Sequence, residues 1–139
     1  MNWVFWALLS ALFAGITAVL AKAGVTGVDS NVATAVRTTV VLVLAWAVAL
    51  ALAPAGAVGS LSRRTLLFLV LSGAATALSW LCYFRALQLG QASRVAPIDK
   101  LSVVFAIILA GAFLHERLGW HHVAGGALIV AGALVIAWK

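Results

Sequence analysis

The chain has 139 residues, of which 65% are hydrophobic and 9% are charged, and its formal net charge is +6. A soluble domain carries about 25% charged residues, so this composition excludes a water-soluble protein and predicts an all-α integral membrane protein. Helices are favoured over a β-barrel because the apolar runs are continuous rather than alternating. The nine basic residues are scattered rather than clustered, which argues against nucleic-acid binding.

Five apolar stretches predict five transmembrane helices within a single domain that covers residues 1–139. A span of the hydrocarbon core needs about 20 apolar residues, and the first stretch stays uncharged until Lys22. The single cysteine, Cys82, lies inside an apolar run and excludes an internal disulfide. The expected spans cover approximately residues 2–22, 31–53, 65–89, 95–114 and 120–138.

The second and third spans have recognisable ends. Residues 29–31 (Asp-Ser-Asn) offer an N-cap for the second helix. Arg37 falls inside the second turn of that helix, and Pro54 closes it. The third helix is expected to run to Leu89, where Gly90 stops it.

The fourth span must contain charged residues. The uncharged run Leu101–Leu114 has only 14 residues, which as a helix is about 21 Å long and too short to cross the bilayer. The helix is therefore expected to begin near Val95, which places Asp99 and Lys100 inside it, roughly one turn below the surface.

The fifth span carries two glycines, Gly125 and Gly132, which are seven residues apart and are expected to share a face that permits close packing. Histidines straddle the loop before it, and no second cluster of metal ligands supports them. We interpret them as interfacial histidines rather than as a metal site. The chain is expected to bind no cofactor and to have no enzymatic activity, because no catalytic, phosphate-binding or redox motif is visible.

The cations are distributed almost evenly between the two predicted sides. Loops and ends hold three on each side, Arg63, Arg64 and Arg117 on one and Lys22, Arg94 and Lys139 on the other. A balanced chain is expected to insert in both orientations, so that two opposed copies form an inverted-repeat transporter. The alternative is a fixed orientation with a cytoplasmic C-terminus, which follows if the embedded cations on that side, Arg37, Arg85 and Lys100, also count.

The embedded charges need a reason, because the bilayer disfavours them. Lys22 and Arg85 have a structural explanation: they lie near helix C-termini, where the dipole favours cations and long side chains reach water. Arg37 lies near a helix N-terminus, against the dipole, and therefore needs a carboxylate, a cavity or a ligand. Asp99 is short and cannot reach far, which favours a function; the alternative is an acid in the first turn of a helix that starts at Pro97.

The excess of embedded cations over carboxylates predicts a site for an anion, or for the carboxylate of a zwitterion. Arg37 would hold it with help from the other cations, and Asp99 would balance charge or carry a coupling proton. Two aromatic residues of the third span would form a wall, although aromatic residues at helical spacing also serve packing alone. The expected site residues are Arg37, Asp99, Lys100, Lys22, Arg85, Trp80 and Tyr83.

Several segments carry a family resemblance. They read LFAGITAVLAKAGV and NVATAVRTTVVL in the first half, then YFRALQLGQASRVAP, LSVVFAIILAGAFLHERLG and GGALIVAGALVI. The chain resembles the EamA-type domain of the drug/metabolite transporter superfamily, and VAPIDKLS resembles its short, single-domain bacterial/archaeal transporter branch. Larger relatives carry two such domains in inverted orientation. The resemblance thus implies half of an inverted-repeat transporter in a prokaryotic inner membrane.

One departure bears on the substrate. The related small multidrug exporters carry a glutamate in their first span that binds protons and cationic drugs, whereas this first span has no carboxylate. Our hypothesis is a homodimer in the lipid bilayer that moves a small polar metabolite by alternating access. The alternatives are a non-transporting membrane subunit that stabilises or regulates a partner protein, and a cationic drug exporter in which Asp99 replaces the missing acid.

Overall fold

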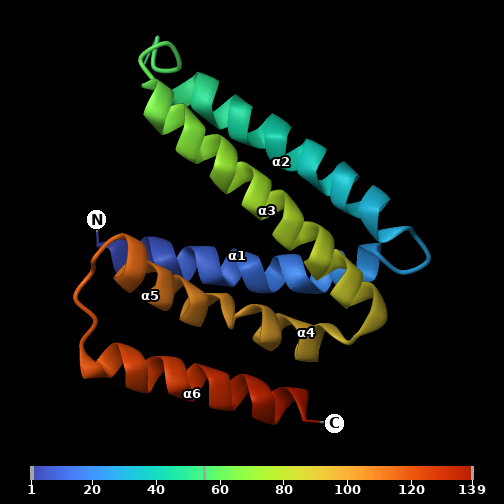
Figure 1. Ribbon diagram of the computed structural model, residues 1–139. Coiled ribbons are helices and arrows are strands. Elements are labelled where there is room, and N and C mark those ends of the chain that lie inside the picture. The colour runs from blue at the N-terminus through green and yellow to red at the C-terminus, as the bar shows by residue number, and fades with distance from the viewer. Residues whose placement is uncertain (1, 55, 139) are drawn as a thin grey trace. The chain divides into compact units, whose positions relative to one another are not determined.

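The structure, a computed structural model, describes residues 2–54 and 56–138, so that Met1 and the terminal cation Lys139 lie outside the described residues. Within these residues all regular secondary structure is helical (Figure 1). The helices are α1 (Trp3–Gly24), α2 (Ser30–Leu52), α3 (Arg63–Leu89), α4 (Ala92–Asp99), α5 (Ser102–Phe113) and α6 (Trp120–Ala137).

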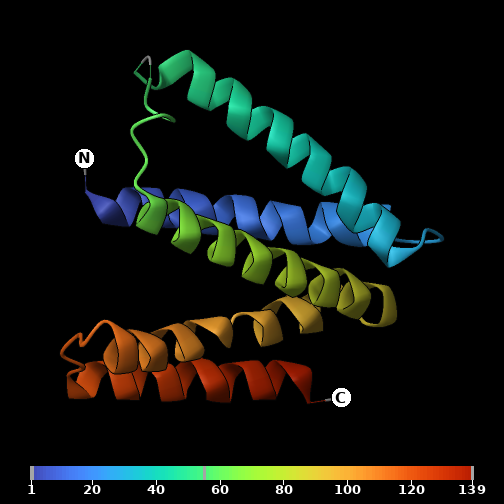
Figure 2. The same cartoon turned by 45° about the horizontal axis from the view of Figure 1, so that its top comes forward.

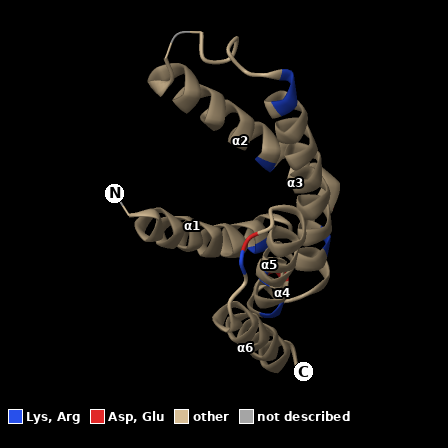
Figure 3. Cartoon of the chain, turned by 60° about the vertical axis from the view of Figure 1, so that its left-hand side comes forward, with Lys and Arg blue, Asp and Glu red and all other residues tan. Residues whose placement is uncertain are grey.

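Five helical stretches of the described chain are long and apolar enough to cross a bilayer, which confirms the predicted all-α architecture with five spans. Helices α1, α2, α3 and α6 each form one span. The remaining span, Ala92–Phe113, is formed by α4 and α5 together. Figure 3 marks the charged residues, and α1, α2 and α6 run over long stretches without any. The helices group into two compact units, one of residues up to Ala23 and from Leu89 onward, the other of Gly24–Gln88.

In the unit Gly24–Gln88, α2 begins where its sequence provides a cap. The Asp29 carboxylate accepts hydrogen bonds from the backbone N–H groups of Asn31 (2.8 Å) and Val32 (3.2 Å), which confirms the expected N-cap. The next turn buries Ser30 and Thr34. The Thr34 hydroxyl donates to the Ser30 carbonyl at 2.7 Å, so its burial leaves no hydrogen-bonding group unpaired.

The end of α3 is buried in the same unit. Phe84 and Leu87 of α3 are buried, and so is Val25, shortly before α2 begins. The Gln88 side-chain amide donates to the Val28 carbonyl at 2.8 Å and ties the end of α3 to the segment that leads into α2. Figure 2 shows α2 and α3 joined at their other ends by a long loop. The buried residues of this unit therefore lie where α2 starts and α3 ends.

In the other unit, α6 runs back along α4 and α5 (Figures 1 and 2). Its buried residues are Gly126 and Ala133, which are seven apart and share a face. The expected pair lies one position away, with Gly125 half-buried and Gly132 exposed. The predicted spacing is present, but the face that packs within the chain is rotated by one residue, about 100° around the helix axis.

This face gives a test with matched substitutions. Ala133→Leu inserts three carbon atoms where α6 meets its neighbours and is expected to destabilise the chain by about 1–3 kcal/mol. Ala131→Leu makes the same change two residues earlier, at an exposed position, and is expected to change stability by less than about 0.5 kcal/mol. Unfolding of both purified variants in a denaturing detergent measures the difference. Equal destabilisation would contradict the assignment of the packed face.

The fourth span differs from the uninterrupted helix expected from the sequence. It begins at Ala92 rather than near Val95, and a turn at Lys100–Leu101 divides it into α4 and α5. Pro97 lies inside α4 and does not mark a helix start, so the reading of Asp99 as a first-turn acid is wrong: Asp99 is the last residue of α4. Pro97 is tolerated there because the hydrogen bond it removes is the one to the Ser93 carbonyl in the first turns of α4; the division at Lys100–Leu101 follows Pro97 and is not explained by it.

Candidate functional site

Arg37, the cation expected to bind the substrate, lies over an aromatic side chain. Its guanidinium carbon is 4.1 Å from the centre of the Trp80 ring and 5.7 Å from that of Phe84. A cation over an aromatic face gains about 0.5–1 kcal/mol when exposed and about 2 kcal/mol when water is excluded. The aromatic rings thus supply a stabilising partner for a cation that lies within an apolar span.

Helical geometry explains how one cation meets two rings. Trp80 and Phe84 are four residues apart on α3 and therefore share a face. Arg37 lies two turns into α2, just beyond the segment that buries Ser30 and Thr34. The Gln88–Val28 hydrogen bond joins the end of α3 to the segment that leads into α2, which keeps the arginine near the aromatic face of α3.

The hydrogen-bonding edge of Arg37 stays open. Within residues 2–54 and 56–138 no hydrogen bond or ion pair of its guanidinium is present, and its contacts with Trp80 and Phe84 are with aromatic rings. A guanidinium presents five N–H donors in a plane, in a fork that matches carboxylate and phosphate oxygens. Trp80 contacts the Arg37 guanidinium, and the N–H groups of the guanidinium remain available to an oxyanion.

Tyr83, the other expected wall residue, is half-buried and meets Phe84 edge to face, with ring centres 6.4 Å apart. It therefore lies beside the aromatic face that holds Arg37. The sequence indicated this aromatic cluster, but it did not show that Arg37 stacks on it. The available signal was the spacing of Trp80 and Phe84, which places the two rings one above the other.

The expected helper cations Lys22 and Arg85 bind groups of their own chain. The Lys22 ammonium donates to the Gly90 carbonyl at 2.8 Å and caps the chain just after α3. Arg85 donates to the Gln88 side-chain oxygen at 2.6 Å, and Gln88 continues to the Val28 carbonyl. Sequence reasoning missed Gln88, because a glutamine at a helix end has no distinctive pattern.

Asp99 and Lys100 form an ion pair at the turn between α4 and α5. The Lys100 nitrogen is 3.6 Å from a carboxylate oxygen of Asp99, and the two side chains are 56% and 34% exposed, respectively. Both belong to the unit that contains α4–α6, whereas Arg37, Trp80, Tyr83 and Arg85 belong to the other. Each unit therefore carries its own group of candidate residues.

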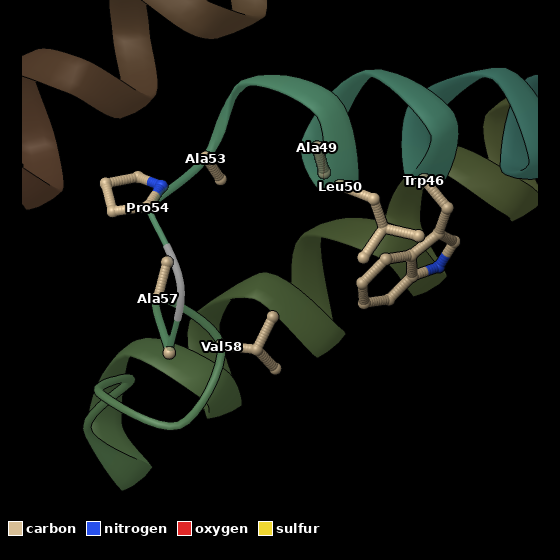
Figure 4. A pocket seen from close by; sticks show the side chains of 8 residues that line it. Trp46, Ala49, Leu50, Ala53, Pro54, Ala57 and Val58 are labelled. Atoms are coloured by element: carbon tan, nitrogen blue, oxygen red, sulfur yellow. The ribbon is translucent and has the colours of Figure 1, made fainter.

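A small cavity lies at the far end of α2 (Figure 4). Its volume is about 170 Å³, and Trp46, Leu50, Pro54 and Val58 contribute to its wall. The lining carries no charged side chain, and Trp46 follows Arg37 by nine residues, about 13 Å along the helix. The cavity therefore offers no charged side chain that would fix an ionic ligand.

The two histidines in the first turn of α6, His121 and His122, contribute to its start. The His122 Nδ1 atom accepts a hydrogen bond from the Gly119 backbone N–H at 3.0 Å, and the rings of His121 and His122 are 4.2 Å apart. The bond to Gly119 closes the first turn of α6, as a capping side chain does. It gives His122 a structural partner at this helix end.

Comparison with known proteins agrees with the five-span architecture. The sequence matches the EamA-like transporter family over residues 1–138. It is 51% identical over 136 residues to a protein from Sinorhizobium sp. named "Uncharacterized transporter in cobO 3'region", and the match covers 98% of this chain and 96% of the relative. No solved structure matches. This multi-pass membrane protein therefore belongs to the EamA-like transporter family.

Proposed function

We propose that the chain is half of a transporter that carries a small polar anion or zwitterion across a prokaryotic inner membrane. Two copies, in opposite orientations, would form a homodimer and work by alternating access. Membership of a transporter family supports the general activity. The stack of Arg37 on Trp80, with an open N–H edge, is the observation that carries the substrate class.

The chemistry of that stack favours an oxyanion. A carboxylate can accept two parallel bonds from the guanidinium edge, while the contact with Trp80 restricts the arginine side chain and reduces the entropy lost on binding. A cationic drug would meet like charge at Arg37, which is costly in a medium of low dielectric constant. We therefore favour an anion or zwitterion over the cationic drug of our alternative hypothesis.

Transport into proteoliposomes tests this proposal. The purified chain is reconstituted, and uptake is followed for labelled succinate, glutamate, inorganic phosphate and glycine, with tetraphenylphosphonium as the cationic comparison. We expect saturable uptake of at least one anion or zwitterion and none of the cation. Uptake of the cation alone would establish a cation exporter. A chain that aggregates unless another membrane protein is co-expressed would favour a subunit that stabilises a partner.

A further inference from the structure

The turn at Lys100–Leu101 interrupts the backbone hydrogen bonding of the fourth span. The Leu101 N–H donates to the Ile98 carbonyl (3.0 Å), and the Val103 N–H donates to the Lys100 carbonyl (3.0 Å). These bonds reach back three residues instead of four, as in a 3₁₀ turn. Lys100 and Leu101 keep right-handed helical dihedral angles, so the chain continues in the same direction through the turn.

Two carbonyl groups lose their backbone donors as a result. Within the described chain, no backbone N–H is bonded to the carbonyl oxygen of Pro97 or Asp99. Unpaired backbone groups do not occur against lipid, and non-helical backbone at membrane depth is found only where it is buried in protein or lines a water-filled cavity. The Asp99–Lys100 ion pair at the same turn is itself too polar to lie against lipid, which favours the second explanation.

The depth of the turn makes this hydration significant. Asp99 is the last of the 8 residues of α4, and the whole span has 22 residues. The carboxylate is therefore about 10 Å from the start of a helical stretch about 33 Å long. An ion pair at this depth is polar enough to need water, yet it adds no net charge.

Few other charges are placed to act on this pair. Arg94 lies on the same short helix and is exposed, and Lys22 donates to Gly90, ahead of α4. The helix that packs on α4 and α5 is α6, and its residues 123–137 contain no ionisable side chain; His121 and His122 lie at its first turn. Lys100 is thus the counter-ion of Asp99.

We propose that this turn is a site that takes up one proton together with one negative charge of the transported anion. The inference rests on the proposed function. In the empty site the Asp99 carboxylate pairs with the Lys100 ammonium, and the net charge is zero. When Asp99 takes a proton from water, the ammonium is released and binds an oxyanion of the substrate, and the net charge is again zero.

Neutrality in both states is the physical basis of the coupling. A membrane interior penalises net charge, so an anion that arrives without a proton would leave the site negative. On the other side of the membrane the anion leaves Lys100, Asp99 returns its proton to water, and the ion pair forms again. The cycle moves one proton with each negative charge that Lys100 binds.

Proton uptake on anion binding tests the inference. The purified protein is placed in a lightly buffered detergent solution with a pH indicator. Succinate, glutamate or inorganic phosphate is added, and binding is measured in parallel by equilibrium dialysis. We expect about one proton taken up per anion bound. In Asp99→Asn, which cannot accept the proton, the anion still binds at Lys100 without proton uptake, and uptake into vesicles is abolished.

Control variants distinguish a role of the Asp99–Lys100 pair from the loss of any nearby cation and from a loss of folding. Lys100→Met is expected to lose the anion that binds at the turn and the proton uptake that accompanies it. Arg94→Gln removes a cation from the same helix without touching the turn, and is expected to behave as the wild type. Should Asp99→Asn fail to fold, the exchange Asp99→Lys with Lys100→Asp keeps the pair in reversed order and is expected to retain coupled binding.

The outcomes distinguish this inference from the proposed function. Anion binding without proton uptake, or proton uptake that persists in Asp99→Asn, overturns the coupling role of the turn and leaves an anion transporter with another coupling. Binding of none of the anions overturns the proposed substrate class and this inference together. Loss of binding in Arg94→Gln as large as in Lys100→Met overturns the assignment to Lys100.

Discussion

Replacing Arg37 by alanine is expected to abolish uptake of the transported anion while the protein stays folded. The substitution removes the charged fork that we propose binds the substrate and leaves the indole of Trp80 in place. A hydrogen bond to a charged group contributes about 1.5–3 kcal/mol, which corresponds to roughly 10- to 100-fold in affinity for each bond lost. Initial rates of uptake over a range of anion concentrations measure the effect.

The substitutions around Arg37 separate charge from geometry. Arg37→Lys keeps the charge but loses the planar fork and the stack, so we expect weak uptake. Trp80→Leu removes the ring that holds the guanidinium, whereas Trp80→Phe retains a smaller aromatic face, so the first is expected to impair uptake more than the second.

A matched control exists on α3. Arg64 also lies over a ring, with its guanidinium carbon 5.9 Å from the centre of Phe68, but it stands at the first turn of α3. Arg64→Ala therefore removes a similar cation–aromatic contact away from the proposed site, and uptake is expected to be unchanged. Wild-type uptake by Arg37→Ala would remove Arg37 from the substrate site.

Single cysteines at Ser60 and Ser93 are both expected to react with a membrane-impermeant reagent in intact cells, each in part of the population. Ser60 precedes α3 and Ser93 follows it, so one span separates them and they face opposite sides of the membrane. Both residues are exposed. If the chain inserts in both orientations, each position is accessible in a comparable share of the molecules.

The labelling needs a cysteine-free background, because Cys82 is exposed on α3. Cys82→Ala provides it, and its uptake is compared with the wild type before labelling begins. Labelling after the cells are made permeable gives the full signal of each position. If one position alone reacts in intact cells, the orientation is fixed, and an antiparallel homodimer is replaced by a parallel one or by a partner that supplies the other half.

Much of the architecture was predictable from the sequence, because a bilayer imposes simple requirements. Continuous apolar runs of sufficient length must become helices that satisfy their own backbone. This requirement, together with Asp29 as a cap, predicted five spans and the start of α2. The family was also predictable from several segments spread along the chain.

Other features depended on interactions that composition and spacing do not encode. The glycine spacing in α6 predicted a packed face, but the face that packs within the chain is centred on Gly126 and Ala133, because the neighbouring helices decide which side is buried. Likewise, Pro97 suggested a helix start, whereas α4 begins at Ala92, tolerates Pro97 internally and ends at Asp99.

The sequence by itself determined the spans, the family and the presence of costly charges within the apolar segments, since each depends on local hydrophobicity or on motifs along the chain. Only the tertiary structure decided what those charges contact. It placed Arg37 on Trp80, Lys22 on the Gly90 carbonyl, and Asp99 beside Lys100. Such contacts follow from how helices pack and where a helix is interrupted, and a long flexible cation has several partners within reach until the packing selects one.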